Sequence, residues 1–167
     1  TQLQALLSLA RVAGVCPQHR TEDSSPVDTE MRDRILTAVL KLDNKELDLQ
    51  SQLVMQRLIQ ITLNRFGAPE DSTRSALISS IDPLFPSKSD DLNWLLCETL
   101  AFLESPQVAA KAMAMIQAVP TQEEQMQYAR SIRMLKSGWT PELQTAYFEW
   151  FIKAANYRGG ASFEKLI

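Results

Sequence analysis

Residues 100–116 read LAFLESPQVAAKAMAMI, and this stretch decides the fold class. An apolar helical segment ends near Leu103, a short turn at Ser105-Pro106 follows, and a second helix rich in small side chains begins. Serine is a favoured N-cap and proline suits the first helical position, so we expect Ser105 to cap the second helix. Alanines at positions 109, 110 and 112 allow close helix approach, as stacked antiparallel helix pairs require.

The rest of the chain carries helix signals of the same kind. Ser25-Pro26 and Thr140-Pro141 each open a helix, and the residues from Thr121 to Glu124 form a capping box. Gly14 predicts a helix end, because glycine is the usual terminating residue. No stretch alternates apolar and polar residues as a strand does, so we predict an all-α fold. The predicted helix pairs cover residues 1–42, 46–85, 88–119 and 121–157.

The spacing of the predicted helices indicates a repeat. Helix starts near residues 46, 88 and 121 lie 42 and 33 residues apart. HEAT, armadillo and tetratricopeptide units all have periods in that range, so the period alone leaves the repeat type open. The turn at residues 103–107 resembles the internal turn of a HEAT repeat. We therefore predict a HEAT/armadillo-like α-solenoid of about four antiparallel helix pairs.

Two helices are predicted to carry much of the interior. The helix over about residues 45–66 is apolar on more than one face, which is typical of a helix with neighbours on several sides. We expect it to be central. The helix that follows Asp90-Asp91 is predicted to point these residues inward: Leu92, Leu95, Leu96, Phe102 and Leu103.

Composition limits the function classes. The 167 residues suffice for one domain and are too few for two ordinary ones. Seventeen basic against twenty acidic residues give a net charge of −3, which disfavours nucleic acid as a partner. The apolar runs are far shorter than the roughly twenty residues of a membrane span. Two cysteines, Cys16 and Cys97, are no disulfide framework.

The stretch 135–151, LKSGWTPELQTAYFEWF, holds five aromatic residues. Gly138 is predicted to end the preceding helix in a Schellman motif, which would fold Trp139 back onto Met134. We expect the aromatic rings to belong to the core. A ligand pocket built from Trp139, Tyr147 and Trp150 with Glu149 or Arg133 is the alternative. Along the last helix the predicted inward stripe is Leu143, Tyr147, Trp150, Phe151 and Ala154, with Phe148 and Ile152 off it.

Other candidate chemistry is sparse. His19 is the only histidine, and Cys16-Pro17-Gln18-His19 supplies only two possible metal ligands. No glycine-rich phosphate loop is present. We therefore assign no catalytic, cofactor-binding or metal-binding residue and expect no cofactor in this segment. The remaining candidate is a partner surface that combines a basic row with the two apolar residues off the stripe: Arg130, Arg133, Lys136, Phe148 and Ile152.

Residues 120–163, PTQEEQMQYARSIRMLKSGWTPELQTAYFEWFIKAANYRGGASF, carry a family resemblance. The stretch resembles the HEAT-repeat segment of large exported proteins of planctomycetes and related bacteria. The matching features are Pro120 to Gln125, Gly138 to Pro141, Tyr147 with Trp150, and Tyr157 to Gly160 with Ser162-Phe163. The resemblance implies a parent chain with a sugar-dehydrogenase-like propeller and a c-type cytochrome module that binds haem. It also implies a periplasmic or cell-envelope location.

These observations predict a noncatalytic helical-repeat scaffold rather than an enzyme. We expect residues 1–167 to form one helical-repeat domain, cut from a longer chain. Its role would be to position neighbouring domains of the parent, a redox-associated protein, and to mediate protein contact. The expected partners are those adjacent domains, with no nucleic acid and no membrane span in this segment. The alternative is a small-molecule-binding or enzymatic domain that uses the C-terminal aromatic residues.

Overall fold

The computed structural model describes residues 1–44 and 46–158, and within them it contains eight α-helices, two short 3-10 helices and no strand. The predicted all-α class is confirmed. The predictions for Gly159-Gly160, Phe163, Leu166 and Ile167 lie outside the described residues. The helices are α1 (Gln2–Ala13), η1 (Pro17–His19), α2 (Thr29–Leu40), α3 (Leu49–Phe66), α4 (Asp71–Ile81), η2 (Asp82–Leu84), α5 (Asp90–Phe102), α6 (Val108–Ala118), α7 (Gln122–Ile132) and α8 (Pro141–Ala154).

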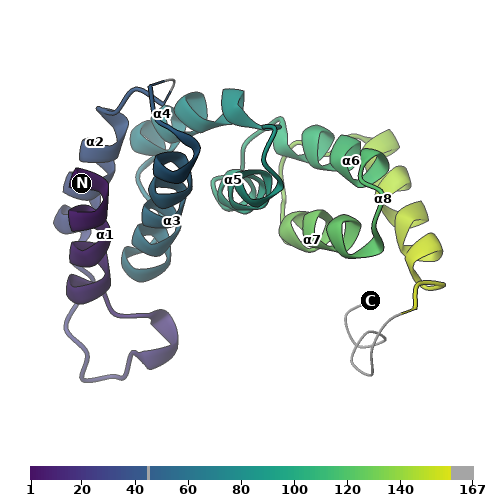
Figure 1. Cartoon of the computed structure of the whole chain (residues 1–167). Coiled ribbons are helices and arrows are strands. Elements are labelled where there is room, and N and C mark those ends of the chain that lie inside the picture. Colours follow the sequence, from purple (N-terminus) through teal and green to yellow (C-terminus); the bar gives the residue numbers. More distant parts are fainter. Residues whose placement is uncertain (45, 159–167) are drawn as a thin grey trace.

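The helices form two rows. Helices α1, α3, α5 and α7 contact one another in that order, while α2 packs on α4 and α6 packs on α8. In Figure 1 α1 and α3 run up and down the view, α6 and α7 run across it, and α5 between them is seen along its axis. The rows are compatible with an α-solenoid that turns sharply at α5. The HEAT or armadillo register of the four pairs stays a prediction.

Helix α5, rather than α3, occupies the central place. It contacts α3, α4, α6 and α7, whereas α3 contacts α1, α2 and α5. The apolar residues of α3 on several faces are explained by those three neighbours. Helix α5 therefore joins the two rows of helices.

Most helix starts follow from a side-chain cap. Thr121 and Glu124 form the predicted capping box at α7, Thr140 caps α8, and α1 ends at Gly14 as predicted. The prediction that Ser25 begins α2 is wrong. The N-cap is Asp28, whose carboxylate accepts the backbone N–H of Met31 at 2.9 Å. The first residue of α2 is therefore Thr29.

Ser105 does not cap α6, which begins at Val108 with no side-chain cap. The α5 helix instead ends in a Schellman motif: Ser105 N donates to Leu100 O at 2.9 Å and Glu104 N donates to Ala101 O at 3.1 Å. Glu104 takes the left-handed position, with φ of 58°, where glycine is usual. The hydroxyl of Ser105 donates to Asp82 Oδ1 at 3.0 Å and so serves the junction with η2.

A single apolar cluster runs through the molecule, and every α-helix contributes a buried side chain to it. Leu96 and Leu100 of α5 are fully buried, as are Ala109 and Ala112 of α6, so the small side chains do permit close packing there. Ala110 is exposed. The prediction that Phe102 faces inward is wrong, because the ring is 52% exposed. The buried stripe of α5 and its end is Leu92, Leu96, Leu100 and Leu103, at helical spacing, and position 102 lies off it.

Candidate functional site

The aromatic residues of the C-terminal region form one connected cluster. Ring centroids lie 5.2 Å apart for Trp139 and Tyr147, and 5.0 Å apart for Tyr147 and Phe151. Trp150 meets Phe151 edge to face, also at 5.0 Å, and contacts Tyr157 at 6.3 Å. Such separations are those of well-packed aromatic pairs. The rings therefore fill space between α8 and its neighbours.

The polar ends of these rings are occupied by the protein itself. Tyr147 Oη donates to Ala129 O of α7 at 2.8 Å, and Trp150 Nε1 donates to Gln125 Oε1 at 3.1 Å. Tyr157 donates to the same oxygen of Gln125. Burial raises the pKa of Tyr147, and nearby Arg133 partly opposes that rise. The geometry is that of a core cluster, in which hydrogen bonds fasten α8 to α7.

Trp139 does not pack as predicted. Its Nε1 donates to Leu135 O at 2.9 Å and its ring lies on Tyr147, while Met134 is 73% exposed. Gly138 has the positive φ of 73° that the sequence suggests, but α7 ends earlier, at Ile132. The glycine serves a close approach instead, because a Cβ there would lie 2.6 Å from Pro106 O.

The predicted partner surface divides into two places. Arg130, Arg133 and Lys136 line a groove of about 470 Å³ between α5 and α7, together with Phe102 and Met134. No side chain of the three basic residues makes a hydrogen bond or ion pair within the described chain. Phe148 and Ile152, on α8, are 65% and 73% exposed, as their place off the stripe predicts, but they do not line this groove.

A second groove, of about 330 Å³, lies between α3 and α5. It shares Glu98 and Phe102 with the first groove and adds Arg57, Gln60 and Ile61. Sequence reasoning missed this site because it placed Phe102 in the core. The signal that could have found it is the spacing of Leu92, Leu96, Leu100 and Leu103, which excludes position 102 from the buried stripe.

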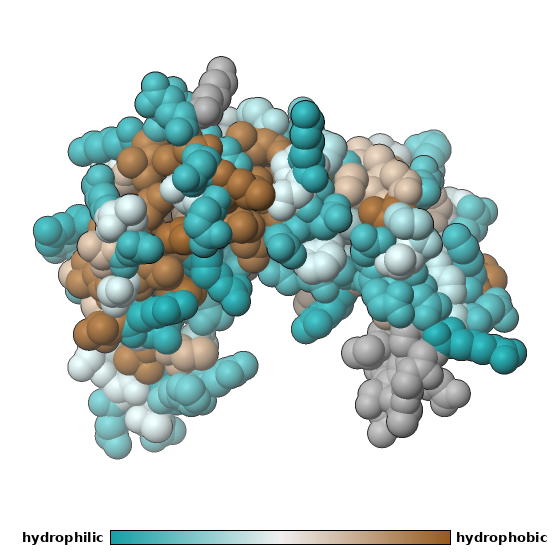
Figure 2. Space-filling model, in the orientation of Figure 1, coloured by the Kyte–Doolittle hydropathy of each residue, from teal (hydrophilic) through white to brown (hydrophobic). Residues whose placement is uncertain are grey.

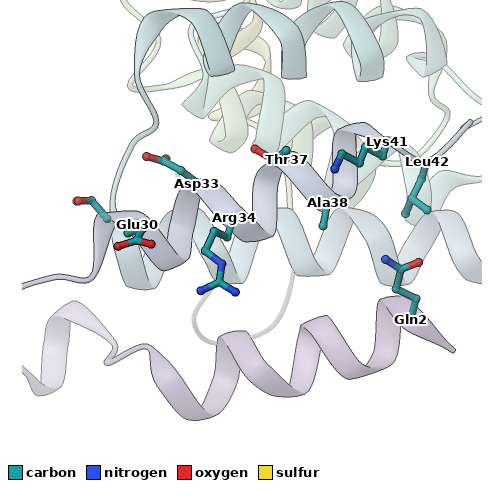
Figure 3. Close-up of a pocket in the computed structure, with 9 residues that line it drawn as sticks. Gln2, Glu30, Asp33, Arg34, Thr37, Ala38, Lys41 and Leu42 are labelled. Carbon is teal, nitrogen blue, oxygen red and sulfur yellow. The ribbon is translucent and has the colours of Figure 1, made fainter.

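A third furrow, of about 880 Å³, follows α2 beside α1 and is drawn in Figure 3. Charges of both signs line it: Glu30 and Asp33, with Arg34 and Lys41. Asp33 is engaged by Arg32, whose Nε donates to Asp33 Oδ1 at 2.8 Å. Such a mixture favours no particular ligand class, and no motif in the sequence pointed to this furrow.

The two cysteines of the described chain lie in different surroundings. Cys16 Sγ donates to Asn64 Oδ1 at 3.8 Å, and Cys97 is buried, which raises the pKa of its thiol to about 12. Both cysteines are free thiols. No cluster of three His, Cys, Asp or Glu side chains with metal-binding geometry occurs over residues 1–44 and 46–158. Within the same ranges no helix combines the length and apolarity that crossing a membrane requires.

Comparison with known proteins adds no relative: no protein-family model, no curated protein and no solved structure matches the chain. The likeness of residues 120–163 to the HEAT-repeat segment of exported planctomycete-type proteins therefore stays a prediction. Interpretation of the surface depends on the geometry of the grooves.

Proposed function

We propose that this chain is a noncatalytic helical-repeat scaffold that positions neighbouring domains and offers a surface for protein contact. The observation that carries the proposal is the single apolar cluster to which α1 through α8 all contribute. Helices that share a close-packed interior cannot move independently without opening cavities. The two ends of the described chain are thereby held at a fixed separation and orientation.

The proposal extends to the setting of the scaffold. The resemblance of residues 120–163 supports a place in an exported, envelope-located protein with a propeller and a c-type cytochrome module. In such a protein the adjacent domains of the parent would be the partners, and haem chemistry would belong to them. The segment would supply geometry alone, so we assign it no catalytic residue.

The contact role is supported by the exposed basic row. Arg130, Arg133 and Lys136 lie beside Phe102 and Met134 in one groove. Arginine, methionine and aromatic residues are enriched where proteins meet, while lysine is depleted there. Four of these five residues, all except Lys136, are of types enriched at protein interfaces.

Distance measurement by double electron–electron resonance tests the scaffold. Spin labels would be attached to cysteines at Ser8 of α1 and Lys153 of α8, both exposed, in a Cys16→Ser background. We expect one narrow distance distribution. As a reference for label motion alone, the pair Ser8 and Thr37 lies within the first two helices, and both residues are exposed. A Ser8–Lys153 distribution much broader than the reference, or one with two maxima, would overturn the rigid scaffold.

A further inference from the structure

The two grooves beside α5 form one continuous surface across α3, α5 and α7. Both are lined by Glu98 and Phe102, which stand between them on α5. The three helices pack side by side in that order. A partner lying across this face would therefore touch three successive helices of one row, which is how solenoids commonly engage extended partners.

The charge of this surface is opposite to that of the chain. Arg57, Arg130, Arg133 and Lys136 line it, against the two carboxylates of Glu98 and Glu104, whereas the whole chain carries −3. A local excess of unpaired cations on an acidic protein favours an anionic partner.

The two carboxylates of the surface are already occupied. Glu104 Oε2 accepts the backbone N–H groups of Lys136 at 3.2 Å and Ser137 at 3.0 Å. Glu98 Oε2 accepts from Gln60 Nε2 at 3.2 Å. Both carboxylates therefore make hydrogen bonds within the protein, whereas no hydrogen bond or ion pair engages the side chains of Arg130, Arg133 and Lys136 among the described residues.

The helix dipole accounts for only part of the basic row: Arg130 and Arg133 lie at the C-terminal end of α7. Cations near a helix C-terminus are favoured within the last turn. Arg130 lies in the last turn of α7, but Lys136 lies four residues beyond Ile132, where the helix ends. The dipole therefore does not explain the position of Lys136.

Apolar contact is available at the centre of the same surface. Phe102 is 52% exposed and belongs to both grooves, and Met134 is 73% exposed in one of them. Exposed aromatic and methionine side chains flanked by arginine suit an amphipathic segment, because the apolar face covers the ring while its acidic face meets the cations.

We propose that the α3/α5/α7 surface binds an acidic amphipathic helical segment of a partner protein. The apolar side chains of that segment would lie on Phe102 and Met134, and its carboxylates would pair with Arg130, Arg133 and Lys136. This inference rests on the proposed function, since it names the class of partner that the contact surface takes. Nucleic acid fits less well, because it offers no aliphatic face to cover Phe102 and Met134.

A designed peptide provides the test. The probe is a fluorescein-labelled amphipathic helix of about fifteen residues, four turns, with leucine on one face and glutamate on the other. Fluorescence anisotropy with the full chain should show saturable binding that weakens as salt increases. A peptide with lysine in place of glutamate, and a single-stranded DNA of similar length, should not compete. Absence of binding, or equal binding of the lysine peptide or the DNA, would overturn the proposal.

Variants assign the site. Reversing two charges, Arg130→Glu with Arg133→Glu, should weaken peptide binding about tenfold or more, and Phe102→Ala should do the same. These side chains are exposed, so thermal melting should change little. Phe148→Ala on α8 and Arg34→Glu in the α2 furrow are matched controls. Both variants should bind the peptide as tightly as the unsubstituted chain does. Binding that survives both groove variants, or that is lost equally in the controls, would refute the site.

The outcome separates this inference from the scaffold. A narrow spin-label distance distribution with no peptide binding would support the scaffold proposal and refute the proposed peptide-binding surface. A broad distance distribution together with specific peptide binding would refute the rigid scaffold and support the proposed peptide-binding surface. If the charge-reversed variant did not fold, Phe102→Ala alone would decide the site.

Discussion

The first four helices and the last four tie their ends together with different side chains. In the first half, Arg65 donates to Gly14 O at 2.7 Å and also to Arg11 O, and Arg32 Nη1 donates to Ala68 O at 2.6 Å. In the second half the donors are aromatic, as when Tyr147 bonds Ala129 O. Both devices satisfy backbone carbonyls near a turn. The aromatic donors also bury large apolar rings. An aromatic side chain therefore contributes burial in addition to its hydrogen bond.

The two halves also differ at the surface. In Figure 2 hydrophobic side chains gather over α1 and α3, whereas the surface over α7 is mostly hydrophilic. The exposed aliphatic residues of the first half are Leu9, Val12, Val15, Val27 and Leu49. The second half exposes fewer but mostly larger apolar side chains: Phe102, Met134, Phe148 and Ile152. Its buried rings are Tyr128, Tyr147 and Trp150, and we expect their removal to be the most costly.

The largest effect should come from the aromatic tie. Trp150→Ala should lower the free energy of unfolding by about 3–5 kcal/mol, because the ring is 7% exposed and its removal leaves a cavity and breaks one of the two hydrogen bonds to Gln125 Oε1. Arg65→Ala, which removes the corresponding tie of the first half, should cost about 1 kcal/mol. Urea unfolding followed by circular dichroism measures both. Equal losses would mean that the two halves are tied with equal strength.

A glycine from each half gives the next comparison. Gly138 and Gly67 both have positive φ, but a Cβ at Gly138 would lie 2.6 Å from Pro106 O, while a Cβ at Gly67 meets nothing within 4 Å. Gly67→Ala should cost about 1–3 kcal/mol from backbone strain alone. Gly138→Ala should cost about 2–4 kcal/mol, because a steric clash adds to the strain. If calorimetry found Gly67→Ala to be the more harmful, the close turn-to-turn packing of the second half would be in doubt.

A mostly buried ion pair contributes to the junction between the halves. Lys111 of α6 contacts Asp82 of η2 at 2.6 Å, and both side chains are mostly buried. Lys111→Met should cost about 1–3 kcal/mol in urea unfolding, since Asp82 would lose its only ion-pair partner among the described residues. The matched control is Arg74→Met, which breaks the exposed pair with Asp71 and should stay within about 0.5 kcal/mol. Equal costs would show that the junction adds nothing.

The smallest effect at neutral pH concerns the two cysteines, one in each half. Burial raises the pKa of Cys97 from 9.0 to about 12, so the unfolded chain gives up this proton at lower pH than the folded chain. The free energy of unfolding should therefore be unaffected below pH 9 and should decline as pH rises from 9 toward 12. Titration of urea midpoints measures this, and Cys97→Ala should flatten part of the decline.

Thiol labelling is the companion measurement. With Ellman's reagent in the folded protein, Cys16, which is partly exposed, should react quickly and buried Cys97 slowly. Both should react quickly in urea. Two equally fast thiols in the folded chain would contradict the burial of Cys97.

The sequence predicted features that depend on a few neighbouring residues. The all-α class, the capping box at Thr121, the start at Thr140-Pro141 and the outward place of Phe148 all follow from local spacing and cap chemistry. Ser105 escaped prediction because a Schellman motif at Glu104 competes with the N-cap, and nothing in the local pattern marks a glutamate for that position. In the fold, the hydroxyl of Ser105 donates to Asp82 and its backbone N–H completes the Schellman motif, so Ser105 does not act as the N-cap of α6.

The α3/α5/α7 surface was not predicted, for a related reason. Its residues Arg57, Phe102 and Arg130 come from three helices, so no local pattern connects them. The basic row on α7 was visible in the sequence, but pairing it with Phe148 and Ile152 assumed that α7 and α8 present one face. The contacts of α5 with both α3 and α7 were needed to show where the row leads.

Native-state hydrogen exchange of the Leu96→Ala variant tests most directly whether one apolar cluster runs through both halves. Leu96 is fully buried in α5, which contacts helices of each half. We expect a loss of about 2–5 kcal/mol, appearing equally in the slowest amides of α3 and α7. Loss of protection confined to α5–α8, with α1–α4 unchanged, would show two independent units instead of one continuous scaffold.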